Sequence, residues 1–189
     1  MAIKKDWYQI FAPPIFGKRV IAETLCSESE HILGRTVHIS LAELTNNISK
    51  FYMIMHFKIV QLDGHNAFTE FVGHNIMTDQ IYRMVSKGKS RIDNVEGIVT
   101  KDGKKIRIKI LTILYKKSKT SVKSAVRKTI SNKLQELIKN KTIEDIVKMI
   151  VSGDLQKGLK ESVKKIYPVR TIEIRKSEII SGKNKSSNA

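Results

Sequence analysis

The sequence is poor in the residues and patterns that secreted and membrane proteins need. The only cysteine among its 189 residues is Cys26, which excludes an intramolecular disulfide and is compatible with a reducing cytosol. No apolar run approaches the ~18–20 residues that cross a bilayer. The N-terminus also lacks the continuous apolar stretch of a secretory signal. These absences predict a protein that works in the cytoplasm.

Motifs for catalysis, metal binding and nucleotide binding are missing as well. The sequence contains no HxxxH or HExxH, no second thiol beside Cys26, and no GxxxxGK[ST], GxGxxG or GxSxG. Its carboxylates are few and dispersed, although folding can still bring distant ones together. We therefore expect no metal, no cofactor and no enzymatic activity. The sequence has five histidines without metal-ligand spacing, and we interpret His56 and His74, which lie in predicted strands, as structural or RNA-facing groups and not as ligands; the others are His31, His38 and His65.

Negative charge is scarce too, and the excess of positive charge is unevenly distributed. The chain carries 35 Lys and Arg against 18 Asp and Glu, a net charge of +17. Residues 1–94 hold 11 basic and 9 acidic side chains, whereas residues 95–189 hold 24 and 9. A general enrichment in lysine, as in AT-rich genomes or heat-adapted organisms, does not explain this difference between the halves. The asymmetry indicates a polyanionic partner, and nucleic acid is the one we favour.

The stretch with the highest positive charge is residues 101–133, where 12 basic residues stand against Asp102 alone. After a tight turn at Asp102-Gly103, basic residues alternate with isoleucines. In a strand this pattern buries the isoleucines and places successive cations ~6.6 Å apart, close to the spacing of phosphates. Together with the basic N-terminus, this stretch supplies the predicted RNA-binding residues: Lys4, Lys5, Lys101, Lys104, Lys105, Arg107, Lys109, Lys116, Lys117, Lys119, Lys123, Arg127 and Lys128.

The order of predicted elements is strands first, then helices, then one strand. Alternating apolar residues predict strands over 34–40, 50–62 and 67–74, and apolar residues at helical spacing predict a helix over 121–139. This order predicts an α+β fold, namely an antiparallel β-barrel-like body with flanking helices and extended basic termini. We expect an extended arm over 1–19, a single domain over 20–180 and a flexible tail over 181–189; within the domain, the chain is strand-rich to about 119 and helical over about 120–166, with a final strand over about 168–176.

The N-terminal arm combines basic and aromatic residues with a stiff Pro13-Pro14 pair. Trp7 can either stack on RNA bases or anchor the arm to the protein body. Because the prolines hold the arm close, we expect Trp7 to pack on the body. Neither the arm nor the tail has a pattern that would give it its own core face.

A set of short segments, in order and spread over nearly the whole chain, resembles one family: the archaeal and eukaryotic small-subunit ribosomal protein S-one-e, also called S-three-a-e. The combination of KKDWY, APPIF and IYPVR is the most specific part of this resemblance. With only three residues before KKDWY and a tail that stops at Ala189, the sequence is similar to the short archaeal form. The segments are KKDWY at 4–8, APPIF at 12–16, GR at 34–35, SLAEL at 40–44, FKI at 57–59, FVGHNIMTD at 71–79, TKDG at 100–103, SAVRK at 124–128 and IYPVR at 166–170.

The resemblance implies a barrel-like body docked on the platform of the small ribosomal subunit near the messenger exit. It also implies contacts with ribosomal RNA, with neighbouring platform proteins and with messenger RNA near the exit, and no catalytic residues. Two alternatives remain open from the residues themselves. One is a free RNA-binding translation factor or RNA chaperone, and the other is an RNA-processing enzyme whose site forms only on folding.

Overall fold

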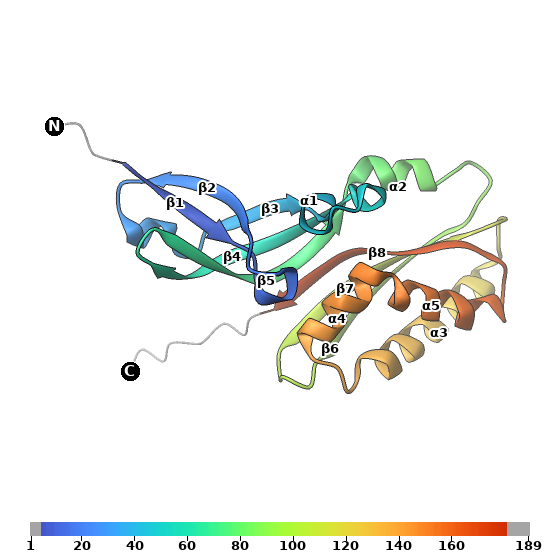
Figure 1. The fold of residues 1–189 in the computed structure, drawn as a ribbon. Helices are drawn as coiled ribbons and strands as arrows, with labels where there is room; N and C mark the ends of the chain where they lie inside the picture. Colours follow the sequence, from blue (N-terminus) through green and yellow to red (C-terminus); the bar gives the residue numbers. More distant parts are fainter. Residues whose placement is uncertain (1–4, 181–189) are drawn as a thin grey trace, which may run out of the picture. The chain divides into compact units, whose positions relative to one another are not determined.

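A computed structural model describes residues 5–180 of the chain. The chain divides into two compact units, Met1–Met77 and Thr78–Ala189, which we call unit 1 and unit 2 (Figure 1). The predicted tail over 181–189 and the predicted contact residue Lys4 lie outside the described residues.

Unit 1 is built on a mixed five-stranded sheet in the order β2-β1-β5-β4-β3. The β1–β2, β4–β5 and β3–β4 pairs are antiparallel, and β1 lies parallel to β5. A short helix α1 follows β3 and is N-capped by Ser40, whose Oγ accepts a hydrogen bond from the Ala42 backbone N–H. The strands are β1 (Asp6–Phe11), β2 (Val20–Cys26), β3 (Thr36–Ser40), β4 (Met53–Asp63) and β5 (Asn66–Ile76), and α1 is Leu41–Thr45.

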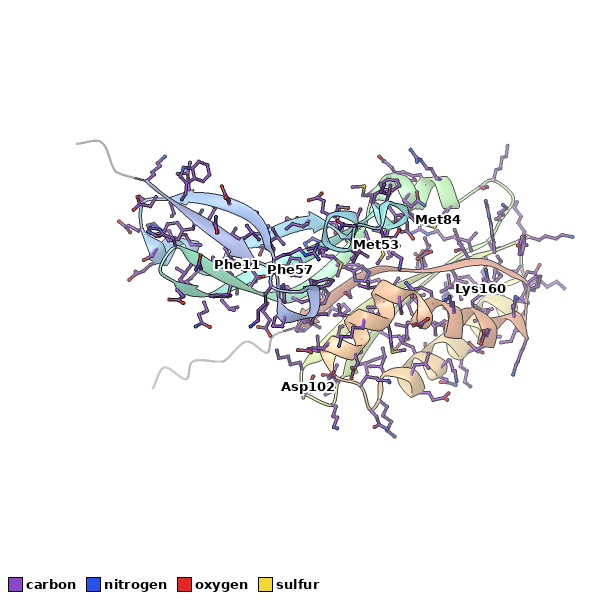
Figure 2. All side chains as sticks on the ribbon, in the orientation of Figure 1. Phe11, Met53, Phe57, Met84, Asp102 and Lys160 are labelled. Carbon is purple, nitrogen blue, oxygen red and sulfur yellow. The ribbon has the colours of Figure 1, made fainter. Side chains whose placement is uncertain are left out.

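The core of unit 1 lies on one face of this curved sheet. In β4 the buried positions alternate along the strand, as the sequence predicts for Met53, Met55, Phe57 and Ile59. The rings of Phe57 and Phe71 meet edge to face with centroids 6.3 Å apart. Figure 2 shows the Phe57 side chain among the strands of this unit.

The expectation that Trp7 packs on the body is wrong. Residues Asp6–Phe11 of the predicted arm form β1, in which Tyr8 and Ile10 are buried at 7% and 2% exposure. Because successive side chains of a strand point to opposite faces, Trp7 lies on the outer face and is 59% exposed. Its cross-strand partner there is Leu25 of β2, which is also exposed. The prolines that follow belong to the turn between β1 and β2 and do not shield the indole.

Unit 2 contains an antiparallel three-stranded sheet in the order β6-β7-β8. Helices α3, α4 and α5 lie together on one face of these strands (Figure 1). The chain reaches this sheet through a short helix, α2. The elements are α2 (Thr78–Met84), β6 (Arg91–Val99), β7 (Lys105–Leu114), α3 (Thr120–Ile138), α4 (Ile143–Ser152), α5 (Asp154–Lys164) and β8 (Val169–Ile180).

The helices of unit 2 form where apolar periodicity and caps coincide. In α3 the fully buried residues Val126, Ile130 and Leu134 recur every four positions, which puts them on one face. Helix α4 begins with a capping box, in which the Thr142 hydroxyl accepts a hydrogen bond from the Asp145 N–H and the Asp145 carboxylate accepts one from the Thr142 N–H. The Thr142 hydroxyl also donates a hydrogen bond to the Asp145 carboxylate at 2.8 Å, and this bond, together with the one from the Thr142 N–H, holds the pKa of Asp145 below its usual value.

The predicted mixture of helices and strands is confirmed, whereas the predicted antiparallel β-barrel-like body is not, because β1 pairs with β5 in parallel and the sheet is not closed within the described residues. Among residues 5–180 the outermost strands of the unit 1 sheet, β2 and β3, are not hydrogen-bonded to each other. A hydrophobic pattern specifies which face of a strand is buried but not which strands pair at the ends of a sheet.

Candidate nucleic-acid interface

The predicted row of cations on β7 is formed by the structure. Ile106, Ile108 and Ile110 are at most 1% exposed, while Lys105 and Arg107 are exposed and Lys109 is half-buried. The turn before the strand places Gly103 at φ 73°, the positive φ that makes glycine suitable there. The alternation predicted from the sequence is therefore confirmed, and the three cations line one face of the sheet.

The neighbouring strand β6 leaves this face open above the cations. Val95, Gly97 and Val99 pair with Lys109, Arg107 and Lys105. Both valines are more than half exposed, at 58% and 59%. Gly97 has no side chain, and the Lys105 side chain lies against it, with its Cε 3.6 Å from where a Cβ would stand. The face thus combines charge with exposed apolar surface.

On the other side of β7, strand β8 contributes two charged residues that the sequence analysis missed. Glu178 lies opposite Arg107 in the sheet, with its Oε2 4.0 Å from Arg107 Nη1, and its Oε1 forms an ion pair with the Lys176 ammonium. The hydrogen bond from Lys176, together with the charges of Lys176, Lys109 and Arg107, holds the pKa of Glu178 below its usual value. We call these residues the ladder face: Lys105, Arg107, Lys109, Lys176 and Glu178.

Glu178 was missed because the expected strand ended at 176, and Lys176 was missed because uninterrupted alternation would place it on the same face as the buried Ile174. The sheet register shifts between Lys109 and Ile110, so that Ile174 and Lys176 pair with successive residues of β7 and Arg175 is left between them. Such a bulge reverses which side chains face the core. Ile174 and Ser177 are both buried although they are three residues apart. Alternation every two residues therefore stops here, and in the sequence alone such a stop indicates the end of a strand.

The predicted cations of α3 lie on the other side of the sheet from the ladder face. Asn94 of β6 donates a hydrogen bond from Nδ2 to Ser131 Oγ (3.0 Å), and Ser131 donates one to Glu96. Asn94 and Glu96 pair with Ile110 and Ile108, so α3 covers the isoleucine face. The structure therefore divides the predicted set, with the ladder face on one side and the cations of α3 on the other: Lys123, Arg127 and Lys128.

The remaining predicted contacts lie at the ends of the sheet. Lys101 and Lys104 are exposed at the β6–β7 turn. There Asp102, labelled in Figure 2, caps the N-terminus of α4 because its Oδ2 accepts a hydrogen bond from the Ile143 N–H at 3.0 Å. The only acidic residue of the 101–133 stretch thus has a structural role. The other residues are exposed, Lys5 in unit 1 and three in the loop after β7: Lys116, Lys117 and Lys119.

The described part of the chain holds no cluster of three or more His, Cys, Asp or Glu side chains that suits a metal ion. His74 is fully buried in β5, and the rings of His38 and His56 meet edge to face with centroids 4.1 Å apart. His56 Nε2 also contacts the side-chain oxygen of Asn75. In residues 5–180 no helix is long and apolar enough to cross a membrane.

The structure thus defines a small protein of helices and strands that carries cations on both sides of its β6-β7-β8 sheet. Residues 2–183 match the Ribosomal S3Ae family. The curated relatives include small ribosomal subunit protein eS1 from Methanoculleus marisnigri, which is 37% identical over 93% of this chain and 89% of its own length. The protein of the same name from Methanothermobacter thermautotrophicus is 35% identical over 94% and 91%. The one from Methanothrix thermoacetophila is 34% identical over 94% and 84%.

The chain belongs to the Ribosomal S3Ae family. Its membership confirms the resemblance read from the sequence, including the likeness to archaeal members. It also confirms that the chain is not an enzyme, because this is a family of ribosomal proteins. The expected location on the cytoplasmic ribosome is confirmed on the same ground.

Proposed function

We propose that this chain is a structural component of the small ribosomal subunit that binds ribosomal RNA through the cations of unit 2. The observation that carries the proposal is the division of charge between the units. Residues 1–77 contain 7 basic and 7 acidic side chains, whereas residues 78–189 contain 28 and 11. The entire net charge of +17 therefore falls within unit 2.

The placement of the cations favours ribosomal RNA over a short single strand. The ladder face and the cations of α3 lie on opposite sides of one sheet, so a single phosphate backbone cannot follow both. Two surfaces of this kind suit a protein that sits between RNA helices and neutralises phosphates on each side. By family analogy we further propose a position on the platform near the messenger exit, with platform proteins and messenger RNA as neighbours.

Binding to small-subunit ribosomal RNA, measured over a series of KCl concentrations, tests the proposal. Replacing all three β7 cations with Gln should flatten the log–log salt dependence by about 0.7–0.9 for each phosphate that is no longer bound. A matched control replaces three exposed cations of unit 1, Lys18, Arg19 and Lys58, and should leave the slope unchanged. Equal slopes for the two triple variants would refute RNA binding by the ladder face.

Sedimentation separates a permanent ribosomal component from a free RNA-binding factor. A structural component should remain on small subunits through a high-salt wash, because many contacts must break together. A translation factor or RNA chaperone should appear in the supernatant. Release of the full-length protein at moderate salt would therefore contradict the structural role while leaving RNA binding intact.

A further inference from the structure

Unit 1 contains a slot that the RNA-binding surfaces of unit 2 do not use. The edge strands β2 and β3 face each other across a pocket of about 350 Å³. This volume falls within the ~300–1,000 Å³ typical of ligand pockets. The walls are three consecutive residues of β2, the first three residues of β3 and Arg35 just before β3, and the floor is formed by Ile10 and Ile59.

The lining shows that the backbone edges of both strands border the slot. Ala22, Glu23 and Thr24 are consecutive in β2, and consecutive side chains of a strand point to opposite faces. Val37 and His38 of β3 contribute to the slot in the same way. A pocket on one face of a sheet would be lined by every second residue. This one is lined by neighbours, because it runs between the strands.

Within residues 5–180 no backbone hydrogen bond joins β2 to β3. Edge strands with free N–H and C=O groups are templates for a further strand. Here the two templates face each other, so one extended segment can pair with both. Such a segment would complete the barrel that unit 1 leaves open. The apolar floor at Ile10 and Ile59 would receive its inward-facing side chains.

One end of the slot carries a positioned positive charge. The Arg35 side chain donates hydrogen bonds to the His31 carbonyl oxygen (2.8 Å), the Thr24 hydroxyl (3.2 Å) and Cys26 Sγ (3.3 Å). All three acceptors are neutral, and no ion pair of the described residues includes Arg35. Glu23 is the one acidic residue of the lining and forms no ion pair with Arg35 among the described residues, so the positioned guanidinium favours a carboxylate on the occupant at that end.

We propose that the slot between β2 and β3 binds an extended, acidic segment of another protein by strand addition. The alternation of donors and acceptors on both edges matches a polypeptide backbone, whereas a nucleotide chain offers no such repeat. The zero net charge of residues 1–77 also fits a protein partner better than RNA. The proposal goes beyond the ribosomal RNA contact, because it assigns unit 1 a binding role of its own.

Fluorescence anisotropy of the full-length chain with a dye-labelled heptapeptide, Glu-Val-Thr-Val-Thr-Val-Glu, tests the proposal. Carboxylates at both ends allow either direction of binding. One control peptide has N-methyl groups on its valines, which removes backbone donors but keeps the side chains. A second control replaces both glutamates with lysine, and a labelled uridine heptamer represents single-stranded RNA.

The acidic peptide should bind, and the N-methylated peptide should bind at least about tenfold more weakly, because each lost backbone hydrogen bond contributes roughly 0.5–1.5 kcal/mol. Arg35→Gln should remove a preference for Glu over Lys ends of up to about fivefold, as expected for an exposed ion pair. Val37→Trp should block the slot, and Arg35→Gln, which disturbs packing less, keeps the test valid if the Trp variant unfolds. Neither variant should change the salt dependence of ribosomal RNA binding.

Three results would overturn the proposal. Absence of peptide binding would show that the slot is no docking site for a strand. Equal binding of the N-methylated peptide would show apolar adsorption in place of strand pairing. Binding of the uridine heptamer that requires Arg35, without peptide binding, would assign the slot to nucleic acid.

Discussion

Glu178 offers the sharpest test of the ladder face, because it is the only acidic residue among four cations there. In the free protein its carboxylate pairs with Lys176 and lies 4.0 Å from Arg107. RNA phosphates must compete with this carboxylate for the same cations. Replacing Glu178 with Gln keeps the shape of the side chain and raises the formal charge of the face from about +3 to about +4.

The Glu178→Gln variant should bind small-subunit ribosomal RNA more tightly, with a log–log salt slope steeper by about 0.7–0.9 for each additional phosphate that the ladder face binds. Its stability should change little, because exposed ion pairs contribute roughly 0–1 kcal/mol. Filter binding over a range of KCl concentrations measures both affinity and slope. The matched control is Glu161→Gln on α5, which removes the same charge at an exposed position away from the ladder face.

If the two variants bind RNA equally, only net charge matters and the ladder face does not contact RNA. Combining Glu178→Gln with Gln at Lys105, Arg107 and Lys109 closes a mutant cycle. In that background the substitution of Glu178 should lose most of its effect, because the cations that it neutralises are gone. If Glu178→Gln changed RNA binding as much in that background as in the wild type, Glu178 would act through groups other than the three β7 cations.

Three further predictions concern stability and exposure. Ile108→Ala should lower the free energy of unfolding by about 2–5 kcal/mol in urea melts, since the side chain is fully buried, while the exposed Val99→Ala should change it by less than about 0.5 kcal/mol. Iodide should quench Trp7 fluorescence in the native protein nearly as well as in the unfolded chain, because the indole is 59% exposed; strong native protection would contradict the β1 register. Thr142→Ala should cost about 0.5–2 kcal/mol by removing the cap of α4. Because the folded pKa of Asp145 is lowered, its contribution is present above the unfolded carboxyl pKa and is lost as the pH falls through the folded value, so the penalty of Thr142→Ala should shrink in acid melts.

Local patterns predicted those parts of the fold that depend on one element at a time. The isoleucine alternation of β7 and the apolar face of α3 both follow from side-chain spacing. In each case neighbours in the sequence decide which face is buried. The family resemblance rested on a different kind of signal, the identity and order of short segments.

Features that depend on pairing between distant strands were not predicted. The parallel contact of β1 with β5 turns the expected arm into a strand of the sheet, and it places Trp7 on the outer face. The bulge around Arg175 brings Lys176 and Glu178 onto the ladder face. The slot beside Arg35 exists because β2 and β3 fail to meet. Each depends on which distant strands pair or on a bulge, and the hydrophobic pattern of a strand specifies its buried face but not its pairing partner.

Because the charge is divided unevenly, the two units would be stabilised by different kinds of partner. Unit 2 carries the whole excess of cations, so its charges repel one another in the free protein, and the phosphates of the proposed RNA partner would relieve that repulsion. Unit 1 is neutral and has nothing to gain from a polyanion, yet it exposes Trp7 and Leu25 and leaves two strand edges unpaired. Exposed apolar residues and free edges are reduced by contact with another polypeptide, and not by phosphates. A chain with both features fits a position where ribosomal RNA and a neighbouring protein meet.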